Sequence, residues 1–211
     1  MYYLLNAKFR HLVVRRDTEL VIEGFPRCAN TFAVVAFEKA QSRPVTIAHH
    51  LHAQAQIANA IDWHIPVLVL VREPFGAVAS LLVRHPNISE NQAMEQYERF
   101  YGFVQENKRH VVIADFHNIA IEYSAVILRI NSHFGTSFAP YWNSASNDAD
   151  VFAAIDRFNL AKEHGNAMQL ARPSVLKAQK KEVVLERLRA HGRMPHLQKL
   201  YGDVVRHESS R

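Results

Sequence analysis

The sequence predicts an α/β fold: a three-layer sandwich with a doubly wound parallel sheet and a helical C-terminal part. Two observations support this prediction. Four short apolar runs recur along the chain, and such continuous runs are typical of strands buried on both faces of a parallel sheet. Segments with apolar residues at helical spacing separate the runs, so strands and helices alternate. Ligands of such sheets bind beyond the carboxyl ends of the strands, so functional residues are expected there.

The expected strands are short and rich in β-branched residues, and they cover residues 20–24, 44–48, 66–71 and 110–114. The strongest is Pro-Val-Leu-Val-Leu-Val at 66–71, and the weakest is 44–48. Helices are expected over 30–41, 52–62, 76–84, 91–108 and 118–134, the last of them with Gly135 as its C-cap. After a loop-like stretch, helices are expected over 149–163 and 177–190. Nothing demands a second domain, so residues 1–211 are expected to form one domain.

Composition limits the class of protein. The 211 residues are 48% hydrophobic, enough for a sizeable core, and the net charge of +5 is a mild basic excess. The basic segment 177–189 is interrupted by Glu182 and Glu186, which is typical of a solvated helix face, so no nucleic acid partner is expected. A single cysteine, Cys28, excludes an internal disulfide framework and suits a reducing compartment.

No membrane span is expected. The longest apolar stretch, residues 67–83, is broken by Arg72, Glu73 and Pro74, whereas a span needs about 20 apolar residues. The first eight residues make a poor signal peptide. A cytoplasmic protein is therefore expected.

The first candidate site follows the first expected strand. A tight turn that carries Arg27 leads into a helix, so backbone N–H groups and a guanidinium point to one spot that favours phosphate or sulfate. The standard phosphate-loop pattern Gly-x-x-x-x-Gly-Lys-Ser/Thr is absent. Cys28 stands at this helix start beside Arg27, which would lower the pKa of its thiol. We nevertheless interpret Cys28 as a small residue of the loop and not as a nucleophile.

Two further candidate sites follow later strands. Arg72 ends the strongest strand, and Ser80 comes eight residues later in the next helix. A guanidinium and a hydroxyl suit phosphate, because both donate hydrogen bonds to its oxygens. The histidines His49, His50 and His52 follow the weak second strand, and a histidine can accept a proton near neutral pH. Neighbouring residues of a strand point to opposite faces, so His49 and His50 are not expected to share a metal ion.

Together these motifs resemble the PAPS-dependent sulfotransferases. Pro26-Arg27-Cys28-Ala29-Asn30-Thr31 is similar to their 5′-phosphosulfate loop, typically Pro-Lys-Ser-Gly-Thr-Thr. Arg72 and Ser80 have the spacing of the family's residues for the 3′-phosphate, although Gly76 stands where the family usually has Asp. His50-Leu51 resembles the family's Thr-His-Leu, which supplies the general base. Ala114-Asp115-Phe116 is faintly similar to Tyr-Glu-Asp-Leu, and only residues 171–177 offer a counterpart of the closing Arg-Lys-Gly loop.

The resemblance covers residues 18–135 and implies a single sulfotransferase-like domain. It implies transfer of a sulfuryl group from 3′-phosphoadenosine 5′-phosphosulfate (PAPS), the co-substrate, to a hydroxyl or amine of a small-molecule or glycan acceptor, with no metal. It assigns binding of PAPS to Pro26, Arg27, Cys28, Ala29, Asn30, Thr31, Arg72 and Ser80. It assigns catalysis to Arg27 and to His50 as the base, with Glu23 and Glu38 as acidic alternatives. A homodimer stays open.

Two other functions compete with this interpretation. A phosphate-loop nucleotide kinase or hydrolase would need a Lys-Ser/Thr pair, which is missing, and a magnesium-binding Asp, for which Asp115 is the single candidate. A non-catalytic, nucleotide-binding member of the fold is favoured by Ala29 and Gly76, which replace family residues. The sequence identifies neither the acceptor nor the oligomeric state.

Overall fold

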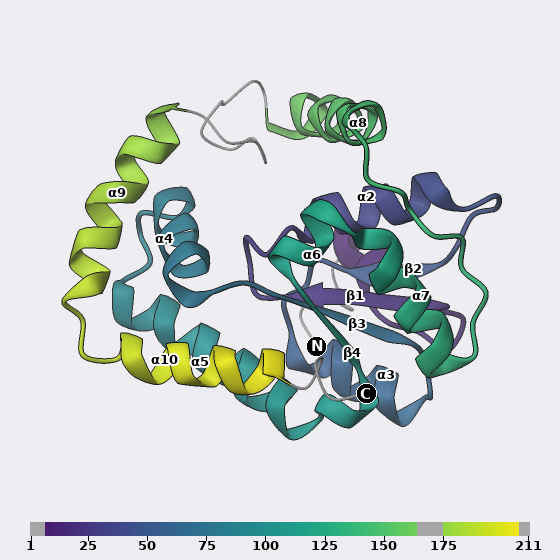
Figure 1. The fold of residues 1–211 in the computed structure, drawn as a ribbon, viewed down its shortest axis with the longest axis horizontal. Helices are drawn as coiled ribbons and strands as arrows, with labels where there is room; N and C mark the ends of the chain where they lie inside the picture. Colours follow the sequence, from purple (N-terminus) through teal and green to yellow (C-terminus); the bar gives the residue numbers. More distant parts are fainter. Residues whose placement is uncertain (1–6, 164–174, 207–211) are drawn as a thin grey trace.

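The centre of the molecule is a four-stranded, all-parallel sheet with the strand order β2-β1-β3-β4 (Figure 1). A computed structural model describes residues 7–163 and 175–206. The strands are β1 (Leu20–Gly24), β2 (Ile47–His49), β3 (Val67–Val71) and β4 (Val112–Asp115). Every residue of β1 and β3 is buried, as their apolar sequences require. The predicted parallel sheet is confirmed.

The strand β2 is shorter than expected. It begins at Ile47 and not at Pro44, because proline has no N–H to donate to a ladder. Its register places Ile22 opposite His49, so β2 ends beside the end of β1.

Helices cover both faces of the sheet. The chain moves from β1 to β2 in one direction and then returns across β1 to β3. Because such crossovers are right-handed, α2 (Asn30–Ala40) and α3 (Gln54–Asp62) lie on opposite faces. The helix α7 (Tyr123–Phe134) lies beside α2, since the Tyr123 hydroxyl donates to Ala33 O at 3.1 Å. On the other face α5 (Glu90–Glu106) packs against α3 and α10 (Met194–Val205). The predicted three-layer arrangement is therefore observed.

Several helices extend beyond the sheet. The helix α4 (Pro74–Arg84) leaves the end of β3, and α9 (Val175–Arg189) packs along it (Figure 1). The helix α8 (Ala145–Glu163) packs on α2, and the short elements are α6 (Phe116–Ile121), η1 (Ala7–Leu12) and η2 (Lys108–His110). In the described parts of the chain, no helix has the length and apolar character needed to cross a membrane.

Two helix predictions need correction. The expected helix over 118–134 is two helices, α6 and α7, which meet at Glu122 with non-helical φ and ψ of −142° and 48°. Asn143 supports this break, because its Oδ1 accepts a hydrogen bond from the backbone N–H of Tyr123 at 2.7 Å. The helix α10 was not expected, because Pro195 and Gly202 weaken its helical signal. Pro195 stands in its first turn, where proline is tolerated, and its buried residues are Met194, Leu197, Leu200 and Val204.

The topology decides where a ligand can bind. The strand order reverses between β1 and β3, and the carboxyl ends of both strands meet at this point. In open α/β sheets, a crevice forms where the connections from neighbouring strands diverge to opposite faces. The loops that follow β1 and β3 flank that crevice.

Candidate functional site

The loop after β1 has an unusual, well-anchored backbone. Arg27 and Ala29 have positive φ values of 72° and 67°, a conformation that disfavours non-glycine residues by about 1–2 kcal/mol each. Ala29 thus adopts the left-handed conformation that glycine takes most readily. Glycine is the residue at this position of the loop in the sulfotransferases that the sequence resembles. Phe25 anchors the loop. Its ring packs edge-on against the Tyr97 ring, with centroids 5.2 Å apart, and its carbonyl accepts a hydrogen bond from Asn30 Nδ2 at 3.0 Å.

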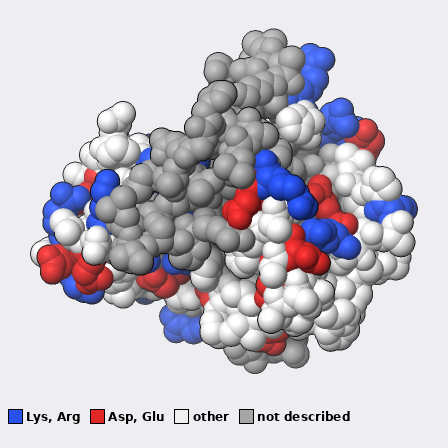
Figure 2. All heavy atoms as spheres, turned by 90° about the horizontal axis from the view of Figure 1, so that it is seen from above, with Lys and Arg blue, Asp and Glu red and all other residues white. Residues whose placement is uncertain are grey.

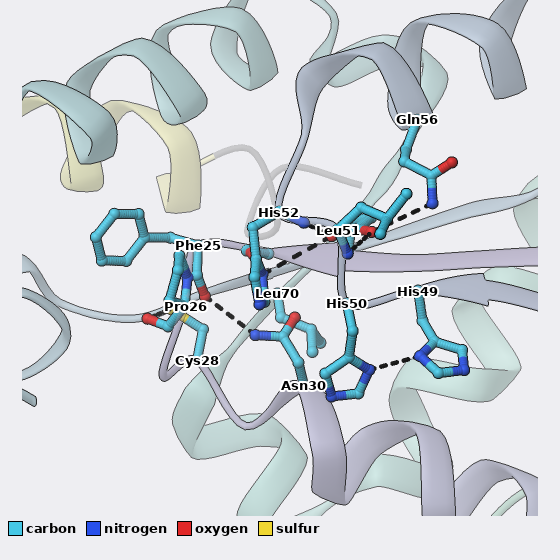
Figure 3. A network of polar contacts seen from close by, with 12 residues as sticks. Phe25, Pro26, Cys28, Asn30, His49, His50, Leu51, His52, Gln56 and Leu70 are labelled. Atoms are coloured by element: carbon cyan, nitrogen blue, oxygen red, sulfur yellow. Dashed lines mark hydrogen bonds and ion pairs between the residues drawn. The ribbon is translucent and has the colours of Figure 1, made fainter. Parts of the chain in front are cut away.

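Four of the six expected binding residues of this loop divide into two groups. Cys28 and Asn30 are buried, and their side chains contact the protein interior, so they can meet a ligand only through their backbone (Figure 3). The side chains of Arg27 and Thr31 are partly exposed. Helix α2 starts at Asn30 after Ala29, whose methyl group cannot cap the first N–H groups. Those N–H groups and the two partly exposed side chains form the donor set for an anion.

Cys28 does not have a reactive thiol. Its Sγ lies 3.3 Å from the Tyr101 hydroxyl, and the side chain is fully buried. Burial raises the pKa of Cys28 to about 12. This effect outweighs the nearby positive charges of Arg72 and Arg27, which lower the pKa. The expectation of a lowered pKa at this helix start is therefore wrong, whereas the interpretation of Cys28 as a residue that fills the loop agrees with its packing.

The structure brings Arg27, Arg72 and Ser80 together. Arg27 Nε donates to Ser80 Oγ at 3.2 Å, and Arg72 Nη1 donates to the carbonyl of Arg27 at 3.1 Å. The Arg72 guanidinium stacks over the Phe116 ring at 4.2 Å, and the Tyr97 hydroxyl donates to Arg72 O at 2.8 Å. These contacts fix both guanidinium groups at the crevice between β1 and β3.

Positive charge is concentrated here. Burial lowers the pKa of Arg27, and the charges of Arg84 and Arg72 lower it further. Burial and the charge of Arg72 also lower the pKa of Lys181 on α9. Arg84 and Lys181 were not among the expected site residues. Arg84 stands one helical turn after Ser80, so the spacing in α4 could have indicated it, whereas Lys181 comes close only through packing of α9 on α4.

This charge arrangement is local. In the view of Figure 2, Lys and Arg side chains of the described residues lie interspersed with Asp and Glu. The arginine cluster differs from this surface in the partial burial of its side chains, and the Glu73 carboxylate lies beside it.

Gly76 has a physical explanation. The Glu73 carboxylate caps α4 by accepting from the Gly76 N–H at 2.5 Å. A Cβ at position 76 would overlap that carboxylate and would lie 3.0 Å from Arg72 Nε. An Asp at position 76 would displace Glu73, because the Glu73 carboxylate already occupies the space of the Asp Cβ.

The histidines do not follow strand alternation. The strand β2 ends at His49, and His50 turns the backbone into the left-handed region with φ of 61°. The rings of His49 and His50 therefore contact each other, with centroids 4.7 Å apart and the two Nδ1 atoms 2.5 Å apart (Figure 3). The expectation that they lie on opposite faces is wrong because His50 has already left the strand.

His50 lies over the start of α2. Its Nε2 is 3.0 Å from Thr31 Oγ1. When His50 Nδ1–H donates to His49 Nδ1, His50 Nε2 carries no proton and can accept one from a hydroxyl at this position. The arrangement of hydroxyl, imidazole and orienting partner is suited to general base chemistry.

The other candidates for a base are placed differently. Glu23 is fully buried, and its two oxygens accept the N–H groups of Leu51 and His52 at 2.9 Å each. Glu38 lies on the exposed side of α2, roughly 12 Å along the helix from its start. His52 Nδ1 lies 2.6 Å from Gly24 O, and burial lowers its pKa. Among these residues, His50 alone faces Thr31. In the described residues no group of three or more His, Cys, Asp or Glu could hold a metal ion.

Comparisons with known proteins add little to this geometry. No family model matches the chain, and no curated protein matches it. Among solved structures, the mouse sulfotransferase SULT7A1 complexed with PAP is similar, with a TM-score of 0.48 and 11% sequence identity. The similarity covers 89% of this chain and 90% of that chain. A likeness at this level carries no argument about the activity of this chain.

Proposed function

We propose that this protein is a PAPS-dependent sulfotransferase built as one sulfotransferase-like domain. It moves a sulfuryl group from PAPS to a hydroxyl or amine of a small-molecule or glycan acceptor. The observation that carries the proposal is the convergence of Arg27, Arg72 and Ser80 at the crevice between β1 and β3, with His50 over the same loop. The sequence resemblance assigns a role to each of these residues, and their positions are compatible with those roles.

The residues fit an anionic nucleotide. Arg72 and Ser80 would hold the 3′-phosphate, because a guanidinium and a hydroxyl both donate to phosphate oxygens. The phosphosulfate would lie over residues 26–31 and accept from the first N–H groups of α2 and, once its proton turns away from His50 Nε2, from the Thr31 hydroxyl. Arg27, which donates to Ser80 Oγ at 3.2 Å, would then lie between the two anionic groups. An anion also relieves the repulsion among the clustered arginines.

The residues also fit the transfer step. His50 Nε2 accepts the proton that the acceptor hydroxyl loses as its oxygen forms a bond to sulfur. Arg27 stabilises the negative charge left on the 5′-phosphate oxygen when its bond to sulfur breaks. The products are the sulfated acceptor and 3′,5′-adenosine bisphosphate. By accepting from His50 Nδ1–H, His49 would hold the tautomer of His50 that leaves Nε2 ready for the proton.

Calorimetry with 3′,5′-adenosine bisphosphate tests the proposal. We expect binding without a metal ion, and much weaker binding of 5′-AMP, which lacks the 3′-phosphate. Arg72→Ala should weaken bisphosphate binding, whereas the matched control Arg99→Ala should not, because exposed Arg99 pairs with Glu95 on α5. Absence of bisphosphate binding would refute the proposal. Preference for Mg-ATP would favour a phosphate-loop kinase or hydrolase, and bisphosphate binding without transfer to any of a broad panel of acceptors would favour a non-catalytic member.

A further inference from the structure

Resting on the proposed function, we propose that Glu23 is a positioning residue that holds His50 over the phosphosulfate loop. It acts through the backbone of the two residues after His50 and does not itself touch the substrate. This role differs from that of an alternative base, which the sequence had left open for Glu23.

Glu23 binds the histidine turn with both carboxylate oxygens. Oε1 accepts the N–H of Leu51 and Oε2 accepts the N–H of His52, each at 2.9 Å. Gln56 Nε2 approaches Oε1 at 3.4 Å, and the Glu23 side chain has no exposed surface (its partners Leu51, His52 and Gln56 are labelled in Figure 3). The carboxylate therefore has no face left for an acceptor molecule.

The turn needs such a partner. His50 and His52 have positive φ values of 61° and 51°, which disfavour side chains with a Cβ. This backbone directs two neighbouring N–H groups toward the interior, where unpaired donors are strongly unfavourable. A carboxylate offers two acceptor oxygens, whereas an amide offers one oxygen and an NH₂ group that would oppose an N–H. Above its raised pKa of about 7, where Glu23 is ionised, the site therefore favours Glu over Gln.

The strand β1 couples the base to the loop. Glu23 and Gly24 end β1, and both contact the turn, because His52 Nδ1 lies 2.6 Å from Gly24 O. The same strand continues directly into the loop of Arg27 and then into Thr31, which meets His50 Nε2 at 3.0 Å. Glu23 thus ties the histidine turn to the strand that carries the loop, and the distance between base and loop is set by one rigid element.

The test compares Glu23→Gln with Glu19→Gln in the full chain. Glu19 is a matched control, because it also accepts a backbone N–H, that of Thr46 at 2.9 Å, but it precedes β1 at the opposite end of the strand. Imidazole NMR signals of His50, assigned with His50→Gln, report its tautomer and environment without any ligand. At pH 8, above the raised pKa of Glu23, we expect these signals to shift in Glu23→Gln and kcat to fall at least about tenfold, with bisphosphate affinity unchanged. Glu19→Gln should change none of these.

The outcomes separate this inference from the proposed function. If the wild-type protein does not bind the bisphosphate, the proposed function fails, yet the NMR comparison still tests the positioning of His50. If it binds, but His50 signals stay unchanged in folded Glu23→Gln, the positioning role is refuted alone. Equal losses of kcat and bisphosphate affinity would also refute it, since they indicate a general structural defect.

A second variant covers the case in which Glu23→Gln does not fold. Glu23→Asp keeps the charge but is one methylene shorter, so it should fold and still displace the His50 signals. In the wild-type protein, hydrogen exchange at the Leu51 and His52 amides should be as slow as in the core strands. Fast exchange at both amides would overturn the proposal whatever the variants do.

Discussion

Arg27 Nε and Ser80 Oγ lie 3.2 Å apart, although 53 positions separate them in the sequence. This contact joins the loop after β1 to the middle of α4. It also brings a partly buried guanidinium beside the hydroxyl that the resemblance assigns to the 3′-phosphate. The predictions below follow from this contact and from its neighbours.

Arg72 and Ser80 should contribute unequally to the binding of 3′,5′-adenosine bisphosphate. Arg72→Ala removes charge-assisted hydrogen bonds and should weaken binding by about 1.5–3 kcal/mol, whereas Ser80→Ala should weaken it by about 1 kcal/mol. Calorimetry at constant ionic strength measures both values, with Arg99→Ala as the control. Unchanged affinity in Arg72→Ala would contradict the assignment of the 3′-phosphate to this residue.

Arg27 should matter more for turnover than for binding. Arg27→Ala should lower kcat by roughly 10²–10³-fold, as expected for loss of a group that stabilises charge in the transition state. Its effect on bisphosphate affinity should be smaller, because this product lacks the sulfuryl group. Steady-state kinetics and calorimetry on the same preparation give the comparison. Equal losses in both would reduce Arg27 to a binding residue.

Cys28 should resist alkylation in the folded protein. Burial raises its pKa to about 12, so almost no thiolate is present at pH 8. We expect iodoacetamide to react with Cys28 at pH 8 far more slowly than it reacts with the free thiol of glutathione. Once the protein is unfolded in guanidinium, the two thiols should react at comparable rates. Mass spectrometry after timed quenching measures both rates. Rapid labelling of the native protein would show that the loop opens.

Glu23 should make stability depend on pH. Burial raises its pKa from 4.5 to about 7 in the folded protein, so folding favours the protonated carboxyl. Its contribution to stability is therefore greatest below pH 4.5 and declines as the pH rises toward 7, by about 3 kcal/mol in total. Urea unfolding at several pH values measures this effect as the difference between wild-type protein and Glu23→Gln.

That difference is needed because neighbouring groups also titrate. His52 Nδ1 lies 3.9 Å from Glu23 Oε2, and burial lowers the pKa of His52, so its contribution to stability is lost as the pH falls. Because His52 is present in both proteins, its effect largely cancels. A difference that does not change between pH 4 and pH 8 would contradict the raised pKa of Glu23.

Gly76 and Gly102 should respond in opposite ways to alanine. In a helix, Gly→Ala normally stabilises by up to about 1 kcal/mol. Gly102→Ala in α5 should do so, because an added Cβ meets nothing within 4 Å. Gly76→Ala should instead destabilise by about 1–3 kcal/mol, because its Cβ overlaps the Glu73 carboxylate and crowds Arg72. Thermal or urea unfolding measures both, and stabilisation by Gly76→Ala would show that the Glu73 cap is dispensable.

The sequence by itself determined the elements that depend on local pattern. Continuous apolar runs sufficed to predict β1 and β3, because a strand buried on both faces needs apolar residues at every position. The spacing between the two residues places Arg72 at the end of a strand. It places Ser80 about two turns into the helix that follows. Their approach to the Arg27 loop follows from the rule that parallel strands direct their carboxyl ends to one edge. Gly135 ends α7 in the left-handed conformation, as expected from its position.

Only the tertiary structure decided how the site is assembled in detail. Strand alternation failed for His49 and His50, because a left-handed residue after β2 turns one ring onto the other. The raised pKa of Cys28 comes from burial beneath α5, which no local motif indicates. Glu23 meets Leu51 and His52 across 28 and 29 positions of sequence. Contacts of this kind depend on how separate elements pack against each other, and the periodic pattern within one element does not specify that packing.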